Sequence, residues 1–198
     1  MALNAKEIMV PLADQTLTTG AAFSGDVIDT IPADFDAAAT ALASLTATGY
    51  LSEDGIALST SFSLTDFKEM NRGTVRKGVD DFTGTISYTE LQIMNEAVLE
   101  RKFGEDNVTV TAATSTTSKK IKVKIGNQLP PIQTFAFKLK DGAAKAIVWV
   151  KQGQITNGLD MTFAANSMAS VPMEVSCYDN GSNDSIYIFF DDGTVVSG

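Results

Sequence analysis

The chain of 198 residues contains no histidine and only one cysteine, Cys177. Without histidine it lacks the commonest general base, the commonest zinc ligand and the base of every Ser-His or Cys-His nucleophile. A single cysteine cannot form an internal disulfide, which is typical of proteins made in a reducing cytosol. These absences favour a protein that is not an enzyme and that binds no metal or other cofactor.

Long apolar runs are also missing. No segment approaches the roughly 18 apolar residues that a membrane-spanning helix needs, and the start, MALNAKEIMVPLAD, has no apolar core of a secretory signal. The composition is 44% hydrophobic and 20% charged, which excludes a disordered chain. The length predicts one domain spanning residues 1–198, with no membrane association.

The net charge of −9 argues against a conventional nucleic-acid-binding protein, which would carry a basic surface. The charges are unevenly distributed along the chain. Residues 107–152 contain eight lysines and one acidic residue, whereas residues 153–198 contain six acidic residues and no basic one. Two interpretations stay open: separate solvated faces, or complementary patches suited to self-association.

Two helices are predicted. Asn95 is a good N-cap and Gly104 a natural C′ residue, so a helix is expected at about 95–103 with Val98, Leu99 and Phe103 on one apolar stripe. A possible short helix nearer the N-terminus is expected to have Pro32 in its first turn, Asp34 and Asp36 near its positive end and Gly49 as its stop. Residues 1–30 show only weak strand signals and are expected to form an arm.

The remaining sequence is typical of strands. Strict alternation over 82–89 puts Phe82, Ile86 and Tyr88 on one face and Thr83, Thr85, Ser87 and Thr89 on the other. Turn signals predict hairpins at Asp54 and Gly55, at Asp141 and Gly142, at Asn157 and Gly158, and at DNGSND (179–184). Short strands with frequent turns predict a mainly β fold, an antiparallel β-sandwich or barrel with one flanking α-helix.

Most candidate sites in this sequence have a simpler structural explanation. DNGSND lacks the ligand spacing of a calcium loop, and Cys177 and Trp149 lie in strand-like runs that predict burial. Lys120, Lys122 and Lys124 share one strand face, but no aromatic residues accompany them for nucleic-acid stacking. We therefore interpret this face as solvated or as a contact between subunits.

Residues 64–81 are the strongest candidate for function. They are expected to form a long projecting loop, and long loops in compact domains are usually functional or disordered. Because no catalytic set accompanies them, their mixture of basic, acidic and apolar side chains favours an interface between subunits. The candidate contact residues are Phe67, Lys68, Glu69, Met70, Arg72, Arg76 and Lys77.

At this point the sequence resembles the major tail tube proteins of bacteriophages with long, non-contractile tails of the siphovirus type. The resemblance covers about residues 40–192 and depends on the order of several motifs. These are GYLSEDG (49–55), RGTVR (72–76), a Thr-rich strand running into NEAVLERKFG (95–104), and the ending VSCYDNGSNDSIYIFFDDG (175–193). A tryptophan-glycine pair that often appears in the family is replaced here by MNRGT (70–74).

The resemblance implies a structural protein of the virion tail, made in the host bacterial cytoplasm. Family members form hexameric rings whose inner strands join into one barrel, and the rings stack into a tube for genome delivery into the host. Implied partners are other copies of the chain, a tape measure protein, and tail completion and tip proteins. The segment 64–81 would reach the neighbouring ring.

The tube would let double-stranded DNA pass without binding it tightly, and Thr83, Thr85, Ser87 and Thr89 are candidates for the lumen-facing wall. The alternative function is a monomeric carbohydrate- or receptor-binding β-sandwich module. Such modules usually display clustered aromatic residues, and this chain has one Trp and four Tyr with no visible cluster.

Overall fold

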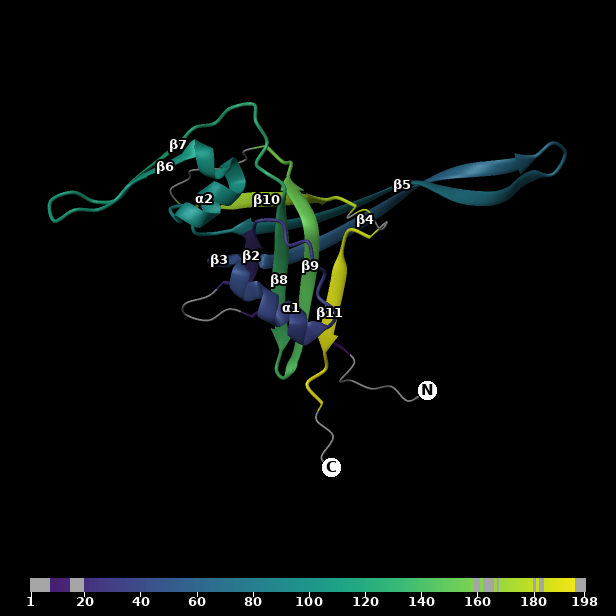
Figure 1. Cartoon of the computed structure of the whole chain (residues 1–198), viewed down its shortest axis with the longest axis horizontal. Helices are drawn as coiled ribbons and strands as arrows, with labels where there is room; N and C mark the ends of the chain where they lie inside the picture. The colour runs from purple at the N-terminus through teal and green to yellow at the C-terminus, as the bar shows by residue number, and fades with distance from the viewer. Residues whose placement is uncertain are drawn as a thin grey trace.

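A computed structural model describes residues 8–14, 20–158, 161, 166, 168–179, 181 and 184–194. The fold is mainly β, as predicted, and Figure 1 shows its arrangement. The helices are α1 (Phe35–Ala41) and α2 (Glu96–Phe103), with 3-10 turns at Leu42–Ser44 and Glu105–Asn107. The strands are β1 (Leu12–Ala13), β2 (Ala22–Gly25), β3 (Thr46–Thr48), β4 (Leu51–Glu69), β5 (Gly73–Glu90), β6 (Val108–Thr111), β7 (Lys120–Val123), β8 (Gln133–Asp141), β9 (Ala144–Ile155), β10 (Val171–Cys177) and β11 (Tyr187–Asp191).

One large antiparallel sheet organises the domain. Its strand order is β3-β2-β8-β9-β10-β5-β4, with β1 added to β8 and β11 added to β9. The strands β8, β9 and β11 run across the direction of β4, β5 and β10, so the bent sheet forms two facing layers (Figure 1). β6 and β7 pair only with each other among the described residues and form a separate ribbon.

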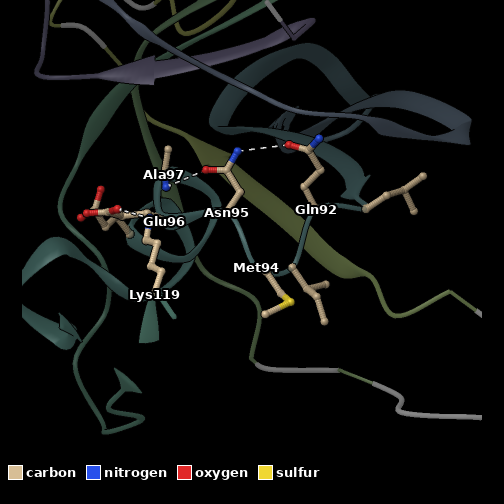
Figure 2. A pocket seen from close by; sticks show the side chains of 9 residues that line it. Gln92, Met94, Asn95, Glu96, Ala97 and Lys119 are labelled. Carbon is tan, nitrogen blue, oxygen red and sulfur yellow. Dashed lines mark hydrogen bonds and ion pairs between the residues drawn. The ribbon is translucent and has the colours of Figure 1, made fainter. Parts of the chain in front are cut away.

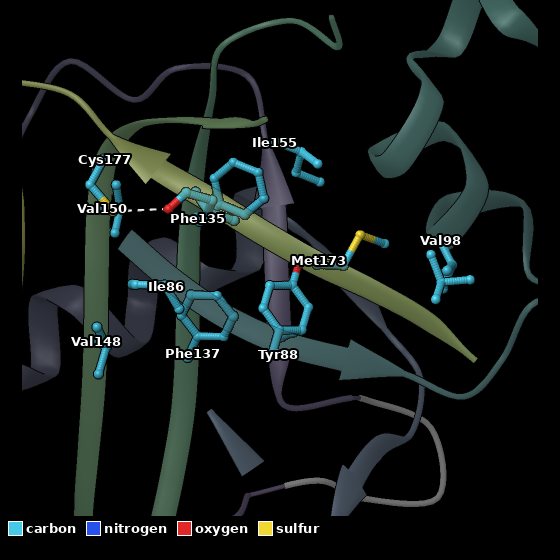
Figure 3. Close-up of a cluster of buried hydrophobic side chains, with 13 residues drawn as sticks. Ile86, Tyr88, Val98, Phe135, Phe137, Val148, Val150, Ile155, Met173 and Cys177 are labelled. Carbon is cyan, nitrogen blue, oxygen red and sulfur yellow. Dashed lines mark hydrogen bonds between the residues drawn. The ribbon is translucent and has the colours of Figure 1, made fainter. Parts of the chain in front are cut away.

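The main core fills the space between these layers. Phe135 and Phe137 of β8 face Ile86 and Tyr88 of β5, with Met173 of β10 alongside (Figure 3). The Tyr88 and Phe137 rings meet edge to face at 5.0 Å between centroids, a favoured geometry for aromatic pairs. Alternate residues of β8 and β9 point to the opposite face, where α1 covers a second core around Trp149. The hairpin β8–β9 is thus buried on both faces.

α2 begins where the sequence predicts, whereas α1 begins at Phe35, so Pro32 lies before its first turn. The Asp34 carboxylate accepts a hydrogen bond from Ala37 N at 2.8 Å, and the Asn95 side chain accepts one from Ala97 N at 3.0 Å. Satisfying these free N–H groups stabilises a helix start by about 1 kcal/mol. α2 ends at Gly104, as predicted. The N-terminal helix ends well before Gly49, because residues 46–48 leave it to pair with β2 as strand β3.

The predicted hairpin turn at Asp54 and Gly55 is wrong. Both residues lie inside β4, which runs without reversal for 19 residues. The register shifts between Leu51 and Ile56, so this segment is a bulge in the β4–β5 pair. Gly55 has φ of +75°, a conformation that glycine adopts in turns and bulges alike. The Asp-Gly pair therefore marks a bulge here and not a turn.

Residues 64–81 do not form the expected loop. Residues 64–69 of β4 pair with residues 73–79 of β5, and only residues 70–72 turn. We call this two-stranded segment the distal ribbon (residues 64–79). It extends beyond the two-layered body at one side of the molecule, while the β6–β7 ribbon extends at the opposite side (Figure 1).

The structure also corrects the expected N-terminal arm and the expected last hairpin. Within the expected arm of residues 1–30, β2 lies inside the sheet between β3 and β8, and β1 pairs with β8. Residues 1–7 and 15–19 lie outside the described residues. β10 and β11 do not pair with each other, since both follow the same edge of β9. The predicted hairpin at Asn157 and Gly158 is not tested, because residues 159–160 and 162–165 lie outside the described residues.

Candidate assembly surfaces

The distal ribbon brings the predicted contact residues together at one exposed tip. Phe67 lies opposite Arg76, Lys68 opposite Thr74 and Glu69 opposite Gly73. Met70, in the turn, is 97% exposed and Phe67 is 55% exposed. Gly78 lies directly under the Phe67 ring, since a Cβ at this glycine would come within 2.8 Å of the ring edge. The ribbon thus holds an aromatic and a thioether side chain in solvent.

Charges on the distal ribbon are only partly paired. Lys77 Nζ lies 3.4 Å from Asp66 Oδ1, with both side chains substantially exposed. Thr74 Oγ1 donates to the same carboxylate at 3.3 Å. Within the described part of the chain, Arg72 and Arg76 form no ion pair. An exposed pair contributes about 0 to 1 kcal/mol, so these charges contribute little to the fold and are available to a neighbour.

A second surface carries hydroxyl groups. The sequence predicted that Thr85 and Ser87 lie on the opposite face of β5 from Ile86 and Tyr88. The structure agrees, because Ile86 and Tyr88 are buried while Thr85 and Ser87 are not. Side chains directly opposite in adjacent strands share a face. We call the combined surface of β4, β5 and β10 the hydroxyl face: Ser59, Ser61, Ser63, Thr83, Thr85, Ser87, Thr89 and Ser176.

The charges that share the hydroxyl face are acidic. Asp81 lies opposite Ser63, and Glu174 lies opposite Ser87. Across β4 from 57 to 63 and its partners in β5 and β10, no lysine or arginine occurs in this register. A hydroxyl-rich surface with a few carboxylates offers phosphate groups no cationic partner.

β4 also presents a free edge. It is the last strand in the order of the sheet, so one of its sides has no partner along its 19 residues in the part of the chain that the structure describes. Free edges of long strands pair readily with another chain unless they are covered. Among the described residues, the part of β5 beyond the β10 pairing, 73–83, is paired on the β4 side alone. Two unpaired edges therefore border the ribbon.

The lysine stripe lies on the outward face of the β6–β7 ribbon. Lys120, Lys122 and Lys124 are exposed, with Thr111 and Thr109 opposite the first two. Ile121 and Val123 face inwards and line an apolar pocket with Leu99 and Phe103 of α2. This burial explains the alternation of the stretch, and it leaves the lysines directed away from the body.

One buried polar network was missed by the sequence prediction. Arg101 of α2 donates from Nη1 to Glu90 Oε1 at 2.8 Å and to Thr48 Oγ1 at 2.6 Å, and from Nε to Ser24 Oγ at 2.6 Å. Burial raises the pKa of the Glu90 carboxyl, and the Arg101 guanidinium opposes part of that rise. The network attaches α2 to β2, β3 and β5. No local signal could reveal it, because charged helix residues are usually exposed.

A polar hollow lies beside the start of α2. Figure 2 shows Asn95 donating to Gln92 Oε1 at 3.1 Å and Glu96 paired with Lys119 at 2.7 Å. These side chains satisfy one another's hydrogen-bonding groups and charges, which is typical of a structural role.

Cys177 is buried, as predicted, and burial raises the pKa of its thiol to about 12. Its thiol is therefore unsuited to nucleophilic chemistry at neutral pH.

The described residues hold neither a candidate metal cluster nor a candidate membrane-spanning helix. No group of three or more potential metal-binding side chains gathers there. No described helix has the length and apolar character that crossing a bilayer requires.

Comparison with known proteins identifies the family. No curated protein matches the chain. The family model for the phage tail tube protein matches residues 1–196, which is nearly the whole sequence. The free strand edges, the projecting ribbons and the mainly β fold agree with that match. The chain belongs to the phage tail tube proteins and is a structural component of the virion tail.

Proposed function

We propose that this protein assembles into hexameric rings, which stack into a tube that conducts the phage genome into the host. The free edge of β4 carries the proposal. A 19-residue edge with exposed backbone groups is a hazard in a monomer. In a ring, it pairs with a strand edge of the next copy and closes a continuous barrel, which removes the open edge.

The hydroxyl face is proposed to line the lumen, with Thr83, Thr85, Ser87 and Thr89 at its centre. The overall charge of −9 and the acidic Glu174 support this orientation. Negative charge on the wall repels DNA phosphates, so transit requires no breaking of phosphate contacts. A tape measure protein would occupy the same lumen before the genome does.

The distal ribbon is proposed to contact the neighbouring ring through Phe67, Lys68, Glu69, Met70, Arg72, Arg76 and Lys77. Its reach beyond the body and its exposed Met70 support that role. The tail would be of the long, non-contractile type, with completion and tip proteins capping the tube. The protein would be made in the bacterial cytoplasm, with no catalytic activity and no cofactor.

Electron microscopy of the purified, concentrated protein tests the proposal directly. The expected result is hollow rings or tubes with six-fold symmetry in end views. Compact single copies at every concentration, by microscopy and by size-exclusion chromatography, would contradict self-assembly and support a monomeric receptor- or carbohydrate-binding role. Rings of another symmetry would contradict the hexamer alone.

A further inference from the structure

A groove with an apolar floor lies where the β4–β5 pair leaves the body. Its volume is about 870 Å³, and Leu58, Phe62, Val79 and Phe82 line it together with Ile188 of β11. Phe62 is 59% exposed and Val79 is 63% exposed. Phe62 remains this exposed although its ring packs against the Phe82 ring, with 5.1 Å between the ring centroids. Removing such side chains from water stabilises an association in proportion to the apolar area that is buried. The groove is therefore expected to be covered in the assembled protein.

The rim of this groove is acidic. Asp80 and Asp81 of β5 lie on one side, and Asp179 and Asp184, between β10 and β11, lie on the other. No ion pair involves these four carboxylates among the described residues. Ser185, which also lines the groove, has a buried Oγ without a hydrogen-bond partner in the described part of the chain. The groove thus combines apolar surface with unneutralised negative charge.

A lysine side chain fits this combination. Its four methylenes lie along apolar surface while its ammonium group reaches a polar rim. The lysine stripe of the β6–β7 ribbon carries three such side chains on one face, at Lys120, Lys122 and Lys124. Within the described residues these three also form no ion pair. Both surfaces therefore carry charge that the single copy leaves unbalanced.

The two surfaces cannot meet within one copy. The β6–β7 ribbon leaves one side of the body, and the β4–β5 pair that forms one wall of the groove leaves the opposite side (Figure 1). Each copy therefore presents one half of a contact at each end. Repetition of such a head-to-tail contact gives a closed ring if the rotation closes, or a filament if it does not.

We propose that the lysine stripe of one copy occupies the acidic apolar groove of the next copy. This inference rests on the proposed self-assembly and names the contact within it. The charge pattern sets which surfaces meet and in which orientation, since like charges across an interface strongly oppose binding. The apolar floor supplies the desolvated centre of the contact.

Zero-length crosslinking of assembled wild-type protein tests this pairing without altering the chain. A water-soluble carbodiimide joins lysine amines to carboxylates only where they are in contact. The sample is assembled from equal parts of unlabelled and nitrogen-15-labelled protein, so that mixed-isotope products identify links between copies. The expected products join Lys120, Lys122 or Lys124 to Asp80, Asp81, Asp179 or Asp184 of another copy.

Assembled wild-type protein whose lysine stripe links only to other carboxylates would overturn the inference while leaving the proposed function intact. Wild-type protein that never assembles would contradict the proposed function itself, and this contact with it. The two failures are thus distinguished by microscopy of the same sample.

Charge reversal gives an independent test. Replacing Lys120, Lys122 and Lys124 by Glu should raise the concentration needed for assembly by about tenfold or more, because like charges then face each other. Asp80→Lys, Asp81→Lys and Asp184→Lys should have the same effect. An equimolar mixture of the two variants should assemble again, since each ribbon then meets a groove of opposite charge.

The matched control reverses three exposed acidic residues outside the groove, Asp26, Glu105 and Asp106, to Lys. It should assemble at the wild-type concentration. Circular dichroism of each variant checks that it is folded. A mixture of folded variants that stays unassembled, or a lysine variant that assembles normally, would contradict the pairing.

Discussion

Arg101 on α2 and Glu90 at the end of β5 form an ion pair of 2.8 Å, with side chains that are only 1% and 0% exposed. The same guanidinium donates to Thr46 O at 3.0 Å and to the hydroxyls of Ser24 and Thr48. One side chain therefore joins α2 to three strands from the first half of the chain. This makes the pair a structural anchor between the helix and the sheet.

Replacing Arg101 by Met should lower the free energy of unfolding by about 3–5 kcal/mol, because the buried Glu90 carboxylate then loses its cationic partner and keeps only the hydrogen bond from Thr48 Oγ1. Denaturant unfolding monitored by circular dichroism measures the loss. The double variant Glu90→Met with Arg101→Met should be less destabilised than Arg101→Met alone. The control is Lys119→Met, which breaks the exposed pair with Glu96 and should cost about 0–1 kcal/mol. Equal losses in both single variants would contradict the anchoring role.

Asp14 should give the fold an acid-sensitive contact at the N-terminal strand. Burial alone would favour its neutral form, but hydrogen bonds and charge from Lys138 and Lys140, at 2.9 and 3.0 Å, lower its pKa below the ordinary 3.8. A lowered pKa means that the stabilisation is present above pH 3.8 and is lost as the pH falls through the folded-state value.

The matching variant is Asp14→Asn. It should lower the free energy of unfolding at neutral pH and flatten the acid limb of a plot of stability against pH. Amide hydrogen exchange at Lys138 and Lys140 locates the effect on β8. A variant whose stability parallels the wild type at every pH would show that this contact contributes nothing.

The distal ribbon should govern assembly and not folding. Arg72→Glu with Arg76→Glu alters side chains that form no ion pair among the described residues, so the melting temperature should remain nearly unchanged. Long tubes should disappear from electron micrographs. The control, Arg72→Lys with Arg76→Lys, preserves the charge and should still give tubes. Loss of the folded state in the Glu variant would place these residues in the core of the domain, whereas normal tubes would place the contact between rings elsewhere.

The hydroxyl face should prevent the tube from binding DNA tightly. Wild-type tubes are expected to show no appreciable binding of duplex DNA at physiological salt. Ser59→Lys with Thr83→Lys adds cations to this face, so tubes of that variant should bind DNA, and increasingly so as salt is lowered. Ser59→Asn with Thr83→Asn is the uncharged control. Tight, salt-dependent binding by wild-type tubes would indicate that Lys120, Lys122 and Lys124 face the lumen.

Local sequence determined the elements whose cause is local. A helix begins after Asn95 and ends at Gly104 because an N-cap residue and a C′ residue each form their hydrogen bonds within one turn of the helix. Alternation over 82–89 assigned the two faces of β5 because successive side chains in a strand always point to opposite sides. The turn after Asp141 also has a local cause, because it joins two strands that follow each other directly in the sequence.

Tertiary structure alone decided which strands pair and which charges are buried. Gly55 adopts the same positive φ in a bulge as in a turn, and the long β4–β5 pairing selected the bulge. β10 and β11 both follow β9, because its 12 residues offer an edge long enough for both. The partners of Arg101 lie 11, 53, 55 and 77 residues away. Pairing between distant segments depends on the packing of the whole domain, so no short stretch of sequence encodes it.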